Sequence, residues 1–446
     1  MEADTGTHDG GTGAPRRRRV AIACQGGGSH TAFTAGVLRH LLNSPALAPY
    51  EIVGLSGTSG GAVCALLAWY PLLDDDAERA GASLDAFWSD NSASTPVEWW
   101  LNAWMVWASK LENFVVTPAL SPYDSPFAGA ALDDFRAMLE RQVDFRGIAP
   151  RPEAPLLLIG AVDVRSGEFK AFNSRRETIT PDMVLASAAI PTLFRAVDID
   201  GAHYWDGLFS QNPPVRELID AEPDEIWVVQ INPRRRATDP RSVVEIADRR
   251  NELSGNLSLH QELHFIEKIN QLLDDGLLRR DGRYRNIVVR VIELARSPRS
   301  LALGAASKLN RDPAFIHALM DHGRARAEEF LTALAFEDAW RSRDTDAVMR
   351  LFAEDAELWS APPFPDQGVH RGRDAIRPFV TAHLTEEIVV DVTSKQVARE
   401  QVAWTVRAGR GPARPQVQGC AEADIRGGRV AALRLGPGRA DATDRP

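Results

Sequence analysis

Short apolar runs that alternate with helical patterns constrain the fold more than any other feature of this sequence. The runs predicted as buried strands are 20–24, 52–55, 156–164, 225–231 and 287–294. Apolar residues at helical spacing lie between them, at 132–142, 181–189 and 257–278. Continuous apolar strands separated by helices are typical of a parallel sheet with both faces covered. We therefore expect an α/β domain with a mostly parallel central sheet.

The pattern changes after about residue 334. Residues 336–357 predict one or two amphipathic helices, 374–383 predict another, and strand-like segments follow from residue 387. Helices followed by a run of strands indicate a separate, small α+β domain. We expect a disordered leader at 1–17, a first domain at 18–332, a second at 333–438 and a frayed tail at 439–446.

Charge and composition exclude some classes of protein. The chain has 446 residues, with 51 Lys and Arg against 61 Asp and Glu, a net charge of −10. This balance argues against a dedicated nucleic-acid binder. No apolar stretch reaches the ~18 residues of a membrane-spanning helix, and three widely spaced cysteines fit reduced thiols. We expect a cytoplasmic protein, with peripheral contact at the inner membrane face as a further option.

A match to G-x-S-x-G, Gly57-Thr58-Ser59-Gly60-Gly61, lies between a predicted strand and a predicted helix over 62–70. Small neighbours let a serine adopt a strained backbone at a sharp strand-to-helix turn and expose its hydroxyl. The N-terminus of the helix stabilises negative charge that develops there. The motif predicts Ser59 as a nucleophile, with Gly57, Gly60 and Gly61 forming the turn. A Gly/Ser turn without chemistry is the alternative.

A second glycine-rich turn, Gly26-Gly27-Gly28-Ser29, also lies between a strand and a helix. Consecutive glycines let backbone N–H groups converge on an anion. We favour an oxyanion hole for acyl transfer, with a phosphate cradle and a plain tight turn as alternatives. The dinucleotide pattern G-x-G-x-x-G is incomplete, because Thr31 stands at its last glycine.

The segment His203-Tyr204-Trp205-Asp206-Gly207 supplies two candidate bases. Asp206 could take the proton of Ser59 if burial raises its pKa and if it contacts the serine directly. His203 is the alternative, as in Ser-His-Asp systems. An Asp-Gly turn without chemistry is the third interpretation.

These three motifs together resemble the patatin-like phospholipase family over about residues 18–331. The glycine-rich turn matches the family's oxyanion segment, Ser59 its nucleophile, and Asp206-Gly207 its aspartate segment. Residues 186–194, ASAAIPTLF, resemble the helix and proline turn that precede the aspartate strand.

The resemblance implies hydrolysis of (phospho)lipid acyl esters through an acyl-enzyme. It implies a Ser59–Asp206 dyad and an oxyanion hole at Gly26, Gly27, Gly28 and Ser29, with no metal or cofactor. The chain departs from the family pattern in two places. His30 and Thr31 replace a cationic residue and a glycine, and Leu208 replaces a small residue.

Two alternative functions stay open. One is an esterase or thioesterase that acts on soluble acyl substrates. The other is a non-catalytic lipid-binding protein.

Residues from about 334 resemble the SnoaL-like family of cone-shaped α+β domains. The resemblance rests on AVMRLFAEDAELW at 347–359 and VHRGRDAIRPF at 369–379. It implies a curved sheet around an apolar pocket and a role in binding or dimerisation. Asp355, His370 and Asp374 are polar candidates, although each fits a cap or surface position better.

Tryptophans cluster between residues 99 and 107, and Trp100, Trp104 and Trp107 share one helical face. Tryptophan suits lipid–water boundaries, so one interpretation of this segment is an interfacial helix. A Trp-rich helix buried in the core is the alternative. As partners we expect a lipid or acyl-ester substrate and no nucleic acid. Peripheral membrane contact and a homodimer through the C-terminal domain are further hypotheses.

Overall fold

The strands of the protein join in one continuous sheet. The computed structural model describes residues 16–95, 98–100, 102–103, 121–124, 127–191, 193–236, 238–279, 284–294, 303–304, 306–362, 364, 367–385, 388–398, 401–410 and 417–437. The strand order is β10-β9-β14-β13-β12-β11-β8-β7-β1-β2-β3-β6-β5, with β4 paired to β3. Residues 1–15 of the predicted leader and the whole predicted tail, 439–446, lie outside the described residues.

The centre of the first half is parallel, in the order β8-β7-β1-β2-β3. Its strands are β1 (Arg18–Cys24), β2 (Tyr50–Thr58), β3 (Leu156–Asp163), β7 (Glu225–Gln230) and β8 (Val288–Glu293). Antiparallel strands β4 (Phe169–Asn173), β5 (Val197–Ile199) and β6 (Ala202–Asp206) extend it beyond β3. The prediction of a mostly parallel central sheet is confirmed.

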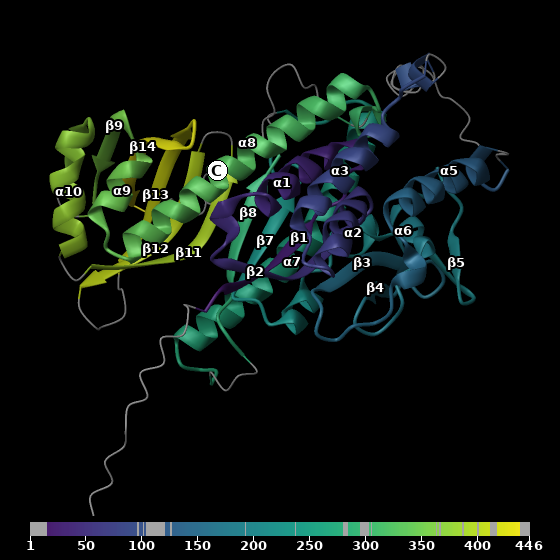
Figure 1. Cartoon of the computed structure of the whole chain (residues 1–446), viewed down its shortest axis with the longest axis horizontal. Coiled ribbons are helices and arrows are strands. Elements are labelled where there is room, and N and C mark those ends of the chain that lie inside the picture. Colours follow the sequence, from purple (N-terminus) through teal and green to yellow (C-terminus); the bar gives the residue numbers. More distant parts are fainter. Residues whose placement is uncertain are drawn as a thin grey trace, which may run out of the picture.

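Helices cover both faces of this sheet (Figure 1). They are α1 (Ala32–Leu42), α2 (Gly60–Leu72), α3 (Ala77–Asn91), α5 (Phe127–Gln142), α6 (Pro181–Ala188), α7 (Val243–Asp274) and α8 (Pro313–Arg341). Helix α7 begins fourteen residues before the predicted start at 257, since 257 − 243 = 14. The reason is local: Ser242 and Glu245 form a capping box that starts the helix there.

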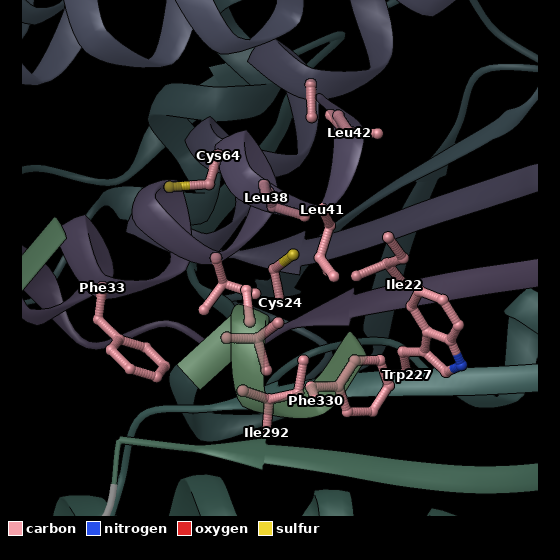
Figure 2. Close-up of a cluster of buried hydrophobic side chains, with 14 of the residues drawn as sticks. Ile22, Cys24, Phe33, Leu38, Leu41, Leu42, Cys64, Trp227, Ile292 and Phe330 are labelled. Carbon is pink, nitrogen blue, oxygen red and sulfur yellow. The ribbon is translucent and has the colours of Figure 1, made fainter. Parts of the chain in front are cut away.

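The pleat of β1 divides the core into two layers. Val20, Ile22 and Cys24 face one cluster, whereas Ala21 and Ala23 face the other. The first cluster packs under α1, α2 and α8, and Figure 2 shows the rings of Trp227 and Phe330 meeting there, with centroids 4.9 Å apart. The second cluster packs under α7, through residues that include Leu259, Leu263 and Ile266. The first half is therefore a three-layer α/β/α arrangement.

The second half is α+β, as predicted. Its elements are α9 (Thr345–Leu351), β9 (Phe352–Ser360), β10 (Gly368–Arg371), α10 (Arg373–Thr385), β11 (Ile388–Ala398), β12 (Gln401–Arg410), β13 (Val417–Arg426) and β14 (Arg429–Pro437). The prediction of helix through residue 357 is wrong, because β9 begins at Phe352. Phe352, Ala356 and Leu358 are buried while Asp355 and Trp359 are exposed, which is the two-residue period of a strand.

A helix, a strand pairing and a buried ion cluster connect the two halves. Helix α8 passes without a break through residue 333, where we place the domain boundary, and Figure 1 shows it lying along both halves. Strand β11 pairs with β8 in parallel, with Lys395 opposite Arg290. The guanidinium of Arg290 is buried between two carboxylates, 2.6 Å from Glu225 and 2.7 Å from Glu337 of α8. A sheet, a helix and a buried ion cluster thus cross the junction together.

Candidate active site

Ser59 occupies a strained turn between β2 and α2. Its backbone has φ 56° and ψ −132°, a region that non-glycine residues rarely adopt. The side chain is buried, with the residue only 8% exposed. A Cβ added at Gly57 would overlap the carbonyl of Gly61, and one added at Gly60 would overlap the hydroxyl of Thr31. The glycines of the motif are therefore required by close packing around the serine.

Hydrogen bonds fix this turn from the side of β3. The amide of Ser59 donates to Ser187 Oγ at 2.9 Å, and the Ser187 hydroxyl donates to the carbonyl of Gly160 at 2.6 Å. The hydroxyl of Thr58 donates to the carbonyl of Gln211 at 2.6 Å. Ser187 lies in α6, within the ASAAIPTLF segment. The sequence singled out that segment but gave Ser187 no role.

Asp206 meets the serine from the end of β6. That strand runs antiparallel to β3 with Asp206 opposite Ala161. The aspartate is 1% exposed and is hydrogen-bonded to the Ser59 side chain. Its Oδ1 also accepts the amide of Leu208 at 2.8 Å. Burial raises the pKa of this carboxyl to about 7, against the lowering effect of those two donors.

His203, the alternative base, points elsewhere. Successive side chains of a strand alternate between its faces, so His203 and Asp206 lie on opposite faces of β6. The Nδ1 of His203 lies 3.6 Å from Asp198 Oδ2. The structure brings Ser59 together with Asp206 and leaves His203 beside the β5–β6 hairpin.

The glycine-rich turn after β1 packs directly against Ser59. A Cβ added at Gly26 would lie 2.9 Å from Ser59 Cβ and would overlap the carbonyl of Thr58. One added at Gly27 would lie 2.6 Å from Ile231 Cγ2. Gly28 has φ 59° and opens the short 3-10 helix η1 (Gly28–Thr31). Only glycines allow this backbone to come so near the serine.

The four predicted oxyanion residues do not offer equal donors. The amide of Gly26 donates to Asn212 Oδ1 at 2.7 Å, so it is already engaged. Gly27, Gly28 and Ser29 lie at the start of η1. The first amides of a helical turn have no acceptor within that turn. The amide of Gly26 is therefore already used, and the role of the other three in an oxyanion hole stays a prediction.

A cluster of buried amide side chains holds this loop from behind. Gln25 Oε1 accepts the amide of Asn232 at 2.8 Å, and Gln25 Nε2 donates to Asn256 Oδ1 at 3.0 Å. Asn212 completes the cluster through its bond to Gly26. All four side chains are buried. Sequence reasoning missed this platform, because its members come from four separate segments.

The two departures from the family pattern are accommodated. His30 is buried with Nε2 2.8 Å from Ser307 Oγ, which ties η1 to the 3-10 helix η6 (Ala306–Leu309). Burial, aided by Lys308, lowers the pKa of His30 to about 3, so its imidazole is neutral. The Leu208 side chain lies 3.0 Å from where a Cβ of Gly255 would be. That glycine of α7 makes room for it.

Other candidates do not converge on a site. Asp355 and Asp374 are exposed, and the His370 ring packs 5.1 Å from that of Phe379. Among the described residues, no three His, Cys, Asp or Glu side chains are grouped to hold a metal ion. In the same part of the chain, no helix combines the length and apolar character needed to cross a membrane.

The tryptophan cluster is described only in part. Trp99 and Trp100 are exposed, at 57% and 59%. Trp104 and Trp107 lie outside the described residues. Two of the predicted indoles therefore face solvent rather than the core.

Two family models match the chain. The model of patatin-like phospholipases matches residues 22–219, and the model of SnoaL-like domains matches residues 333–433. The chain combines a patatin-like phospholipase domain with a SnoaL-like domain. No curated protein matches it.

Three solved structures are each similar to about a quarter of this chain. An NTF2-like protein of unknown function from Mesorhizobium loti is 22% identical, with 24% of this chain and 89% of that chain covered and a TM-score of 0.23. A putative polyketide cyclase from Sinorhizobium meliloti is 27% identical, with 23% and 92% covered and a TM-score of 0.21. A putative ketosteroid isomerase from Kribbella flavida is 19% identical, with 27% and 90% covered and a TM-score of 0.22. Likenesses at these TM-scores carry no information on chemistry.

Proposed function

We propose that this protein is a serine lipid acyl hydrolase that cleaves carboxylic esters of (phospho)lipids. The observation that carries the proposal is the buried, hydrogen-bonded pair of Ser59 and Asp206, with the serine held at positive φ. The patatin-like domain supports the general class of lipid acyl hydrolase.

In the first step, Ser59 Oγ attacks the ester carbonyl carbon while Asp206 accepts the serine proton. A carboxyl with a pKa of about 7 is suited to this exchange near neutral pH, because it can both take and return a proton. The tetrahedral intermediate then collapses to an acyl-enzyme. The alcohol or lysolipid leaves with the proton that Asp206 returns.

In the second step, water attacks the acyl-enzyme. Asp206 accepts a proton from the water, the fatty acid is released, and Ser59 Oγ regains its hydrogen. Both tetrahedral intermediates carry an oxyanion, for which the amides of Gly27, Gly28 and Ser29 are the donors. The loss of one such donor typically costs 10²–10³ in rate.

Peripheral contact with a lipid surface is part of the same proposal. The exposed Trp99 and Trp100 belong to a segment that Asn102 attaches to Asn310, with 3.0 Å between Nδ2 and Oδ1. Asn310 directly follows η6, whose Ser307 contacts His30 beside the oxyanion loop. Indoles inserted at this place would bring a bilayer close to the serine.

Active-site labelling tests the proposal. A fluorophosphonate probe should label the wild-type protein at Ser59, should not label Ser59→Ala, and should label Asp206→Asn much more slowly. No labelling of a folded wild-type protein, with or without detergent micelles, would favour the non-catalytic lipid-binding alternative.

The substrate class needs a separate assay. Release of fatty acid from phospholipid vesicles is compared with hydrolysis of p-nitrophenyl butyrate, a soluble ester. Turnover of the soluble ester alone would favour an esterase. Trp99→Ala with Trp100→Ala should reduce vesicle turnover and leave the soluble reaction unchanged, and Trp359→Ala, an exposed tryptophan of β9, is the control.

A further inference from the structure

A cavity of about 640 Å³ lies at the N-terminal end of the parallel strands, opposite to the end that carries Ser59. Its lining includes Leu156, the first residue of β3, and Ile287, which directly precedes β8. Leu156 pairs with Gly54 of β2, and Ser59 lies 59 − 54 = 5 residues further along. At about 3.3 Å per residue this is roughly 16 Å along the strand. The cavity is therefore separate from the catalytic site.

One side of the cavity is apolar. Helix α7 contributes Phe265, Ile266 and Ile269, and Ile219 faces them from the 3-10 helix η5 (Arg216–Ala221). Phe265 is 58% exposed, one of several apolar side chains of α7 that face away from the sheet. The volume falls within the range of about 300–1,000 Å³ found for small-molecule sites. The wall thus suits an alkyl chain.

The remaining lining is mostly polar and carries charges of both signs. Three guanidinium groups, those of Arg175, Arg176 and Arg285, face it together with two carboxylates, those of Asp220 and Glu222. Arg285 pairs with Glu222 at 2.9 Å, and Arg176 lies 3.4 Å from Asp220. One positive charge remains in excess.

Arg175 is held by backbone carbonyls rather than by a direct ion pair. Its Nε and one terminal nitrogen donate to the carbonyl of Ala154, at 3.2 and 3.0 Å, and its other terminal nitrogen lies 3.5 Å from the carbonyl of Asp220. Within the described part of the chain, no carboxylate forms an ion pair with it. Burial, together with the nearby charge of Arg19, lowers its pKa, against the opposing effect of the more distant carboxylates of Glu153, Asp220 and Glu222. A bound anion would give this guanidinium a direct charged partner.

We propose that this cavity binds an amphiphile with one anionic head and one alkyl chain. The head, a carboxylate or a phosphate, lies against Arg175 and Arg285, and the chain lies along Ile219, Ile266 and Ile269. A long-chain fatty acid has this chemistry. The proposal stands on the cavity and its charges, and it holds whether or not Ser59 is an active nucleophile.

Binding to the full-length Ser59→Ala protein tests the proposal, because this variant removes turnover. Binding is measured as competition with the fluorescent probe cis-parinaric acid. The competitors are oleate, dodecyl phosphate and oleyl alcohol, each at a concentration at which it does not aggregate. The neutral alcohol should bind at least 10-fold more weakly than oleate. Comparison of dodecyl phosphate with dodecanoate, which has the same chain length, identifies the preferred head group.

Two matched pairs of variants locate the site. Ile269→Trp fills the cavity and should weaken oleate binding at least 10-fold, whereas Ile246→Trp, on an exposed part of α7, should not. Arg175→Gln should weaken binding of both anions about 10-fold and leave that of oleyl alcohol unchanged. Arg165→Gln, on the exposed turn after β3, is its control.

Photocrosslinking gives a readout that needs no cavity variant. A diazirine-bearing fatty acid should label peptides that contain residues 265–270 or 284–287. Labelling confined to residues 25–31 and 57–62, with oleate binding unaffected by Arg175→Gln, would overturn the proposal. If Ile269→Trp does not fold, as judged by circular dichroism, the crosslinked positions and the arginine variant still decide.

Discussion

Replacement of Asp206 by asparagine should remove activity and also stabilise the protein at alkaline pH. Burial raises the pKa of the Asp206 carboxyl from the ordinary 3.8 to about 7. Between these values the folded protein retains a proton that the unfolded chain has released, so the free energy of unfolding falls as pH rises. Above both values the buried carboxylate costs about 4 kcal/mol.

Asparagine should avoid this cost without loss of the local hydrogen bonds. Its Oδ1 can accept the Leu208 amide, as Asp206 Oδ1 does at 2.8 Å, and its Nδ2 would face Ser59. We expect Asp206→Asn to unfold at higher urea concentration than wild type at pH 8.5, with a gain of about 2–4 kcal/mol. The gain should fall to less than half by pH 5.

The pH dependence of fluorophosphonate labelling measures the same carboxyl. The wild-type rate should rise with pH to a plateau, with a midpoint near 7, because only the ionised form of Asp206 accepts the Ser59 proton. The asparagine variant should react at least about 10²-fold more slowly. Asp198→Asn, on the neighbouring strand β5, is the control and should change neither property. A midpoint near 4, or an asparagine variant less stable than wild type at pH 8.5, would refute the reasoning.

Three further variants test the surroundings of the site and the junction. Ser187→Ala removes the acceptor of the Ser59 amide; labelling should slow about 10-fold, with a stability cost of about 1–3 kcal/mol. Ser174→Ala, at a buried serine that accepts the Leu157 amide at 2.8 Å, should cost similar stability without affecting labelling. Gly26→Ala should abolish labelling of protein that still folds by circular dichroism, since its Cβ would press on the nucleophile. Glu337→Gln should lower the free energy of unfolding by about 3–5 kcal/mol, because buried Arg290 loses one carboxylate, and a cost below about 1 kcal/mol would contradict this.

Features set by neighbouring residues were predictable from the sequence. The turn at Ser59 needs small residues within two positions on either side, and the motif displays them. The turn of the β5–β6 hairpin is also set by neighbouring residues. Asp200 and Gly201 both adopt positive φ there, between two short strands. The meeting of Asp206 with Ser59 had no such local signal. The segment at 203–207 offered Asp206 and His203 as candidate bases, and the family resemblance favoured Asp206.

Features that depend on distant segments were not predictable. Gln25, Asn212, Asn232 and Asn256 resemble ordinary loop or surface residues in the sequence, and only the fold brings them together under the glycine-rich turn. The pairing of β11 with β8 joins residues about a hundred positions apart, since 395 − 290 = 105. Neither strand carries a pattern that identifies its partner.

That pairing also determines which part of the chain can remain soluble alone. Strand β8 would be the last strand of the parallel sheet of the first half if β11 did not continue it. An open strand edge recruits strands from other molecules and leads to aggregation. The SnoaL-like domain therefore shields the backbone of β8. A chain shortened near residue 333 would lose this shield, and the two domains should be expressed as one piece.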